Sequence, residues 1–185
     1  SSEKASQFIQ LCNQIDVPLL FLHNITGYVV GTDFEQGGIT KNGSKMINAV
    51  TNSTVPHITV IVGASYGAGN YGMSGRAFGT KFTFIWPTAK IAVMGPEQMA
   101  GVMTIVQKAS AERRGAEFDE AANSLREAAV MANAEEQSKG LFATSRVSDD
   151  GMIDPRDTRD VVGFALSAVA NDAVKGTKEF GTWRM

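Results

Sequence analysis

The chain has 185 residues, of which 43% are hydrophobic and 19% charged, and its formal net charge is −2. This hydrophobic content is enough to build the core of one packed globular domain. Its largest basic cluster is the pair Arg113-Arg114, so we expect no nucleic-acid partner. No apolar run approaches the ~20 residues that span a bilayer, and the first residues lack the pattern of a signal peptide, so we expect a soluble domain without a membrane partner.

The first half of the chain alternates helical and extended patterns. Apolar spacing near 3.6 predicts helices over residues 3–15 and 41–54, and apolar runs predict buried strands over 18–22 and 57–62. Glycines among polar residues predict a long loop over 24–38.

Two features of the N-terminal segment bear on its setting. The sequence starts directly in an amphipathic stretch, so we expect a fragment cut on its N-terminal side. The single cysteine, Cys12, allows neither an internal disulfide nor a thiolate metal cage, and a reducing compartment fits best.

The second half repeats the order of strand, glycine and helix. Residues 82–86 and 90–94 predict short strands, and Gly95-Pro96-Glu97 opens a helix with proline and an acid in its first turn. The remaining expected elements are a mobile stretch at 113–115 and one long helix or a bent pair over 117–139, stopped by Gly140. An extended piece at 146–148, a final helix opening at Asp154-Pro155 and a docked tail with Phe180 and Trp183 are expected to follow. Strands alternating with helices predict an α/β domain with a largely parallel, layered sheet.

The strongest local signal is the glycine-rich turn over residues 63–75, which links a strand to a helix. The N–H groups of Ala68 and Gly69 would lack intrahelical acceptors in the first turn, so they form a candidate oxyanion hole. The alternative is that these glycines only let the helix pack closely on the sheet. No lysine follows the last glycine, as a Walker loop requires, and Lys90 stands near the point where a dinucleotide site needs an acid.

Other candidate residues give weaker signals. Glu97 is interpreted as a first-turn carboxylate favoured by the helix dipole, and the apolar loop tip at 28–30 either covers a ligand or partner or folds onto its own domain. His23 and His57 have no acid or cysteine at triad-like or metal-like spacing, and Ser65 and Ser74 have no identifiable base. We therefore expect no metal site, and a reaction in which the substrates supply the base.

The sequence resembles the carboxyltransferase (β) subunits of biotin-dependent acyl-CoA carboxylases, most closely the 3-methylcrotonyl-CoA and geranyl-CoA carboxylase branch. The segments that carry the resemblance are residues 24–31, 63–76, 86–87, 93–98, 150–159 and 183–185. The resemblance implies a crotonase-like (ClpP/crotonase) fold of layered ββα units, with residues 1–185 forming one C-terminal carboxyltransferase domain and the N-terminal acyl-CoA-binding domain absent.

The resemblance also implies the chemistry and the partners. Carboxybiotin, carried on a biotin-carrying α subunit, would give its carboxyl group to the γ-carbon of an acyl-CoA such as 3-methylcrotonyl-CoA, as in leucine catabolism. The N–H groups of Ala68 and Gly69 would hold the ureido oxygen of biotin. The residues implied to line the biotin pocket are Gly27, Tyr28, Gly67, Tyr71, Met94 and Gly95.

The implied enzyme is a homo-oligomer whose site forms with the N-terminal domain of a second protomer, in a bacterial cytoplasm or a mitochondrial matrix. Two positions depart from the family pattern, Ser74 in place of cysteine and Pro96 in place of glycine, and Pro96 removes a potential donor. Geranyl-, propionyl- or acetyl-CoA as the substrate, and an inactive assembly fragment, stay open as alternatives. A hydratase, isomerase or peptidase of the same fold would need an acid–base set that the sequence does not reveal.

Overall fold

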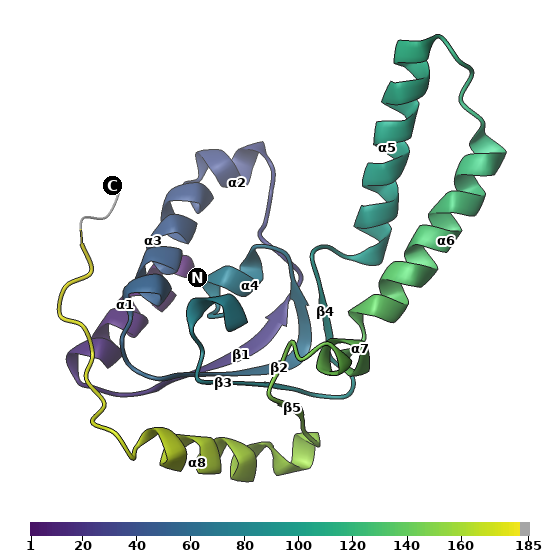
Figure 1. Ribbon diagram of the computed structural model, residues 1–185. Helices are drawn as coiled ribbons and strands as arrows, with labels where there is room; N and C mark the ends of the chain where they lie inside the picture. The colour runs from purple at the N-terminus through teal and green to yellow at the C-terminus, as the bar shows by residue number, and fades with distance from the viewer. Residues whose placement is uncertain (182–185) are drawn as a thin grey trace.

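The computed structural model describes residues 1–181 and contains one parallel sheet flanked by helices (Figure 1). The strands are β1 (Leu19–Ile25), β2 (His57–Tyr66), β3 (Phe82–Ile85), β4 (Lys90–Ala92) and β5 (Gly151–Met152). The longer helices are α1 (Ser2–Gln14), α3 (Ile39–Asn52), α5 (Pro96–Arg114), α6 (Glu120–Ser138) and α8 (Thr158–Val169). The short ones are α2 (Thr32–Gln36), α4 (Gly69–Gly72), α7 (Gly140–Ser145) and the 3-10 turns η1 (Arg76–Phe78) and η2 (Pro155–Asp157).

The central strand is β2, whose two halves pair with different neighbours. On one side it pairs along its length with β1. On the other side its first half pairs with β3 and its last three residues pair with β4, and β3 continues to β5. All of these pairs are parallel, as the alternation of strands and helices predicted. The carboxyl ends of β1, β2 and β4 therefore meet beside the glycine-rich turn.

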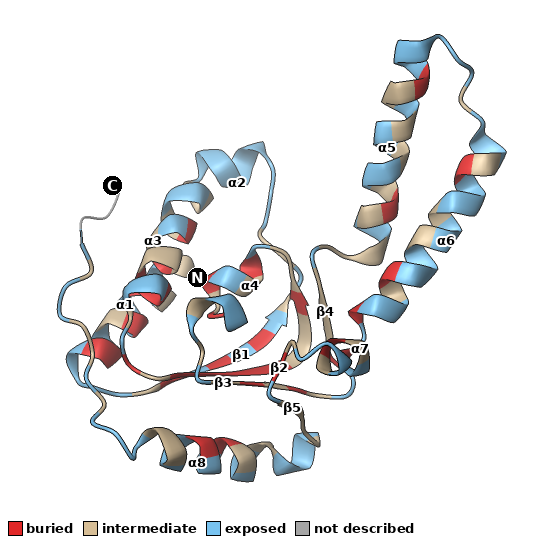
Figure 2. Ribbon diagram, in the orientation of Figure 1, coloured by how far each residue is buried: buried red, intermediate tan, exposed pale blue. Residues whose placement is uncertain are grey.

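Helices α1 and α3 cover one face of the sheet, and α8 lies across the other (Figure 1). The first face is packed because β1 alternates buried and exposed residues from Leu19 onward. Its buried apolar cluster contains Ile9, Cys12, Leu19, Phe21, Ala49, Val50 and Val55. Buried residues concentrate on the strands and on the sheet-facing sides of α1 and α3 (Figure 2).

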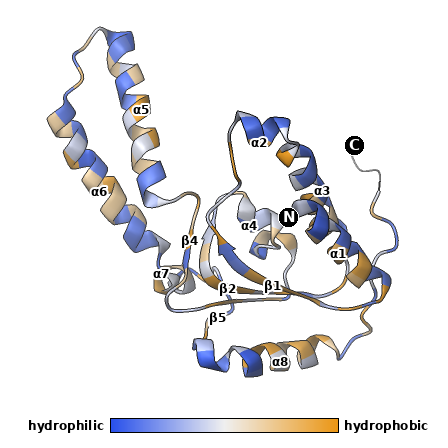
Figure 3. Ribbon diagram, turned by 180° about the vertical axis from the view of Figure 1, so that it is seen from behind, coloured by the Kyte–Doolittle hydropathy of each residue, from blue (hydrophilic) through white to orange (hydrophobic). Residues whose placement is uncertain are grey.

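Helix α8 is apolar along its middle section, which lies under the sheet (Figure 3). It is anchored at its first residue, where Trp86 Nε1 donates a 2.9 Å hydrogen bond to Thr158 Oγ1. As expected, Asp154 caps the turn that leads into it, and Pro155 occupies the first helical position.

Helices α5 and α6 form a hairpin that stands away from the sheet (Figure 1). Its surface is rich in exposed apolar side chains, including Ile105, Val106 and Leu125. No helix within residues 1–181 combines the length and apolarity that a membrane crossing needs.

Several expected boundaries are wrong, each for a local reason. The strand predicted over 57–62 continues to Tyr66 because β4 pairs with its end, so the turn begins only at Gly67. The loop predicted over 24–38 contains the whole of the short helix α2. Gly140 begins α7 and does not simply stop the preceding helix: its N–H donates to Ala89 O at 3.0 Å. A Cβ on Gly140 would lie 3.1 Å from Trp86 O, so close backbone approach explains this glycine.

The pair Arg113-Arg114, predicted to be mobile, forms the last turn of α5, which ends in a left-handed Gly115. The piece predicted to be extended at 146–148 is a turn with Val147 at φ 58°, and the strand follows at Gly151. Phe180 packs against the buried apolar cluster between the sheet and helices α1 and α3, as expected of the tail. Trp183 lies outside the described residues.

Candidate functional site

The glycine-rich turn presents two main-chain donors at the end of β2. Gly67 adopts φ 60°, and its N–H donates to Ala92 O at 3.0 Å, which fixes the turn to β4. Asn70 N and Tyr71 N donate to Gly67 O and Ala68 O at 3.2 and 3.1 Å. The N–H groups of Ala68 and of the following Gly69 have no acceptor within residues 1–181. The turn therefore has the form of an oxyanion site, with two adjacent donors at a helix start.

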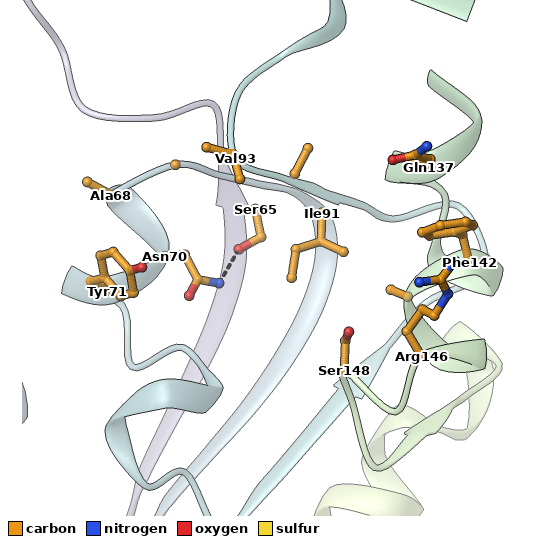
Figure 4. A pocket seen from close by; sticks show the side chains of 13 residues that line it. Ser65, Ala68, Asn70, Tyr71, Ile91, Val93, Gln137, Phe142, Arg146 and Ser148 are labelled. Atoms are coloured by element: carbon orange, nitrogen blue, oxygen red, sulfur yellow. Dashed lines mark hydrogen bonds between the residues drawn. The ribbon is translucent and has the colours of Figure 1, made fainter. Parts of the chain in front are cut away.

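A cavity of about 450 Å³, the turn cavity, lies beside these donors (Figure 4). Its lining residues are Ser65, Gly67, Ala68, Asn70, Tyr71, Ile91, Ala92, Val93, Gln137, Phe142, Ala143, Arg146 and Ser148. Figure 4 shows Ala68 and Tyr71 on one wall, Ile91 between the walls, and Arg146 and Phe142 on the other. No carboxylate of the described residues lines the cavity, and the Arg146 guanidinium lies over the Phe142 ring at 4.7 Å from its centroid. The cavity therefore favours a partly apolar ligand that carries or develops negative charge.

A second cavity of about 540 Å³, the Tyr28 cavity, lies on the other side of α4. Gly27, Tyr28 and Gly69 line it together with residues of α1, α2 and α3. The Tyr28 ring is seated between two helices, since a Cβ on Gly43 or on Gly72 would approach its ring or hydroxyl to 2.9 Å. Burial raises the pKa of the Tyr28 phenol. Tyr28 thus folds onto its own domain, while Val29 and Val30 at the same loop tip stay exposed.

The structure distributes most of the expected site residues between the turn cavity and the Tyr28 cavity. Gly67, Ala68 and Tyr71 line the turn cavity, whereas Gly27, Tyr28 and Gly69 line the Tyr28 cavity. The two donors stand at the boundary between the two cavities: Ala68 is exposed, and Gly69 is buried. Met94 and Gly95 line neither cavity. Gly95 caps the start of α5, with Pro96 in the first helical position as predicted.

Both histidines contact serines, which the sequence analysis missed. His23 Nδ1 lies 2.9 Å from Ser65 Oγ, and His57 Nδ1 lies 2.8 Å from Ser74 Oγ. The expectation that neither serine has an identifiable base nearby is therefore wrong. Spacing along the chain could not show the first contact, because it joins two neighbouring strands across 42 positions. The alternation of β1 was the available signal, since it places His23 on the buried face with Phe21.

Burial controls the charge of both histidines. It lowers the pKa of His23, and the 2.7 Å contact of Nε2 with Met73 O raises that pKa only in part. Burial lowers the pKa of His57 to about 4. Both rings are therefore neutral near pH 7.

Neither Ser–His pair is built as a nucleophile. Ser74 is fully buried, and Ser65 is only 1% exposed although it lines the turn cavity, so neither hydroxyl oxygen is open to attack on a carbonyl carbon in this arrangement. Ser65 Oγ also accepts a 2.8 Å hydrogen bond from Asn70 Nδ2, which makes the oxygen less nucleophilic. Nowhere in the described part of the chain do three or more His, Cys, Asp or Glu side chains gather as metal ligands would.

Comparison with known proteins assigns the chain to a family. Residues 1–182 match the carboxyl transferase domain. A Mycobacterium tuberculosis protein, a probable biotin-dependent acyl-coenzyme A carboxylase beta2 subunit, is 59% identical over 184 residues that cover 100% of this chain and 35% of that protein. The probable mitochondrial methylcrotonoyl-CoA carboxylase beta chain of Drosophila melanogaster is 46% identical over 185 residues, covering 100% of this chain and 32% of that one.

A solved structure gives the same assignment. The beta subunit of geranyl-CoA carboxylase from P. aeruginosa matches with a TM-score of 0.85 and 41% identity, covering 100% of this chain and 34% of its own. The chain thus spans about a third of the length of these relatives. It belongs to the carboxyl transferase domain family found in the β subunits of biotin-dependent acyl-CoA carboxylases, and it has their crotonase-like fold.

Proposed function

We propose that this chain is the biotin-side half of a carboxyltransferase, which moves a carboxyl group from carboxybiotin to the γ-carbon of an α,β-unsaturated branched acyl-CoA such as 3-methylcrotonyl-CoA. The observation that carries the proposal is the pair of N–H groups at Ala68 and Gly69, which no acceptor in residues 1–181 takes up. Ala68 lines the turn cavity, which has no carboxylate among its lining residues in the described part of the chain, and Gly69 follows it at the boundary with the Tyr28 cavity. Family membership supports the reaction class.

The domain division is also part of the proposal. Because the relatives are about three times as long, the acyl-CoA-binding domain would belong to the part of such a protein outside this chain. The complete site would then join this domain to the N-terminal domain of a second protomer in a homo-oligomer. A separate α subunit would bring the biotin. The compartment would be a bacterial cytoplasm or a mitochondrial matrix, and the Drosophila melanogaster relative is described as mitochondrial.

The lining of the turn cavity fits the ureido end of biotin. That group is flat and has one strong acceptor oxygen, and the turn offers main-chain donors at a helix start. The nearby walls include the apolar side chains of Ile91 and Val93. When bound, carboxybiotin would supply the carboxyl group and then a ureido nitrogen as the base for the γ-proton.

The residues of this chain stabilise charge and exclude water. The N–H of Ala68 would hold the ureido oxygen of biotin, and a donor of this kind contributes ~3 kcal/mol to stabilising the negative charge of a transition state. Gly69 would supply the second donor from the same helix start. Arg146 adds a positive potential across the cavity, which favours the same charge. Tyr71 and Phe142 line the same cavity and would shield part of a bound ligand from water.

The donor role can be tested by removing a single hydrogen. Ala68 has φ −66°, which is the value that a proline ring imposes, so Ala68→Pro deletes the donor without requiring a new φ at this position. In a full-length subunit assembled with its biotin-carrying partner, we expect Ala68→Pro to lower kcat by about 100-fold or more, with KM for the acyl-CoA nearly unchanged. The matched control, Ala68→Ser, retains the N–H and should retain activity.

The assay follows incorporation of labelled bicarbonate into a panel of acyl-CoAs that includes 3-methylcrotonyl-, geranyl-, propionyl- and acetyl-CoA. Full activity of Ala68→Pro would refute the donor role, and the preferred acyl-CoA would identify the substrate. The chain alone should give no turnover until the N-terminal half is added. Turnover by the chain alone would refute the half-site proposal.

A further inference from the structure

A chain of buried hydrogen bonds ties helix α4 to the two strands beneath it. His23, on β1, is fully buried, and its Nε2 lies 2.7 Å from Met73 O, the carbonyl that follows the last residue of α4. Its Nδ1 lies 2.9 Å from Ser65 Oγ near the end of β2. Asn70 Nδ2 in the first turn of α4 donates to the same Ser65 Oγ at 2.8 Å (Figure 4).

The chemistry of the partners fixes the direction of every proton in this chain. A carbonyl oxygen only accepts, so His23 Nε2 carries the hydrogen that bonds to Met73 O. Nδ1 is then an acceptor, and the Ser65 hydroxyl donates to it. Ser65 Oγ in turn accepts from the Asn70 amide. One neutral imidazole is therefore hydrogen-bonded to both ends of α4, directly to Met73 O and through Ser65 to Asn70.

Helix α4 needs such external ties because it contains only four residues, Gly69–Gly72. A single helical turn is unstable by itself, since the cost of fixing its backbone exceeds the gain from its few hydrogen bonds. Two of the four residues are glycines, which lose the most conformational freedom on ordering. The position of the donors at Ala68 and Gly69 is therefore decided by what holds α4 on the sheet.

We propose that His23 is a positioning residue for the oxyanion donors, because it holds α4 at both ends through Ser65 and Asn70 on one side and the Met73 carbonyl on the other. The inference rests on the proposed function, in which Ala68 and Gly69 supply those donors. His23 itself touches no substrate, because it is buried beneath the turn. Its loss misplaces the donors and leaves in place the part of the turn cavity that Phe142, Arg146 and Ser148 line.

The test uses three variants of the full-length subunit assembled with its biotin-carrying partner. Ser65→Ala cuts the link between His23 and Asn70 with a minimal change in volume, and His23→Leu removes both imidazole bonds. For both we expect kcat to fall about 10- to 100-fold with KM for the acyl-CoA within about two-fold of the wild type. His23→Gln, whose amide can still donate toward Met73 O, should recover kcat to within about five-fold.

A double-mutant cycle and a matched control separate positioning from general stability. If the chain acts as a unit, the effects of Ser65→Ala and His23→Leu on log kcat are not additive. His57→Leu is the control, since His57 is an equally buried histidine whose two ring nitrogens contact Ser74 and Ser53. It should lower the melting temperature like His23→Leu and leave kcat within about three-fold of the wild type.

Hydrogen exchange of residues 67–72, a range that excludes Ser74, the partner of His57, gives a readout independent of activity. We expect exchange about ten-fold faster in Ser65→Ala and His23→Leu, and unchanged exchange in His57→Leu. Unchanged exchange and kcat in Ser65→Ala and His23→Leu, or an equal loss of kcat in His57→Leu, would overturn the inference. Ala68→Pro, measured in parallel, tests the proposed function separately. Full activity of Ala68→Pro would refute the donor role of Ala68. An inactive Ala68→Pro together with fully active His23 variants would refute only the positioning role of His23.

Discussion

The side chain of Asn70 occupies the space that a side chain on Gly75 would need. A Cβ on Gly75 would overlap Asn70 Oδ1 and lie 3.0 Å from the Asn70 carbonyl oxygen, to which the Gly75 N–H donates at 2.9 Å. Gly75 has φ −65°, an ordinary value for any residue. Glycine is thus required at this position by close contact and not by backbone conformation.

The contact between Asn70 and Gly75 predicts that Gly75→Ala is destabilising. The added methyl group displaces the Asn70 amide from Ser65, and overpacking of this kind costs roughly 1–3 kcal/mol. The free energy of unfolding from urea titration should fall by that amount. The matched control is Gly163→Ala in α8, where a Cβ meets nothing within 4 Å, and alanine there should raise stability by about 0.5–1 kcal/mol. Equal stability of the two variants would contradict the contact.

A second prediction concerns Gly69, whose Cβ would overlap Ile25 Cγ2 and lie 3.5 Å from Gly27 C. Gly69→Val should destabilise the domain by about 1–3 kcal/mol, so a loss of activity in that variant would not isolate the donor. The clash can be measured with the pair Gly69→Ala and Ile25→Ala. Their combined cost in thermal unfolding should be at least about 0.5 kcal/mol smaller than the sum of the single costs, because the shortened Ile25 makes room. Strict additivity would argue against the clash.

The low pKa of His57 predicts a loss of stability on mild acidification. The unfolded chain binds a proton at His57 near pH 6.5, whereas the folded protein does so only near pH 4. The unfolded state therefore holds more protons between these values, and the contribution of His57 is complete above pH 6.5 and decreases as the pH falls. The full loss at pH 4 amounts to roughly 3 kcal/mol, and His23 adds to it in the same direction.

Urea unfolding between pH 7.5 and pH 5 measures this slope in a range where most carboxyl groups do not titrate. His57→Gln removes the contribution of His57, so its stability should depend less on pH than that of the wild type. An identical slope in both proteins would contradict the assignment.

A fourth prediction concerns the anchor of α8. Trp86 Nε1 donates to Thr158 Oγ1, and Thr158→Val leaves this half-buried indole N–H without its acceptor while the side-chain shape is kept. The expected cost is about 1–2 kcal/mol in the free energy of unfolding, with a shifted fluorescence maximum for Trp86. Thr158→Ser, which retains the hydroxyl, is the control. A stable Thr158→Val variant with unchanged emission would show that the hydrogen bond is not formed.

The elements could be predicted from the sequence where the signal was local. Apolar periodicity located α1 and α3 to within about two residues. Asp154-Pro155 marked the start of the last helical segment, because capping and proline geometry act within a single turn. Two of the errors arose at 63–66, where the strand continues through a glycine because β4 pairs with it, and at Gly140, where glycine allows close contact with Ala89.

The site also has features that the local sequence determines and features that only the tertiary structure determines. The sequence by itself determined the glycine turn and the order of strand and helix around it, because these depend on neighbouring residues only. It also predicted free N–H groups at Ala68 and Gly69, because the first residues of a helix lack intrahelical acceptors, whereas the position of these groups depends on contacts with remote residues. The tertiary structure decided that His23 reaches Ser65, that the expected pocket residues divide between two cavities, and that Asn70 needs a glycine at 75. Those facts depend on which strands pair and how closely backbones approach, and such distances between remote residues are set by the packing of the whole sheet.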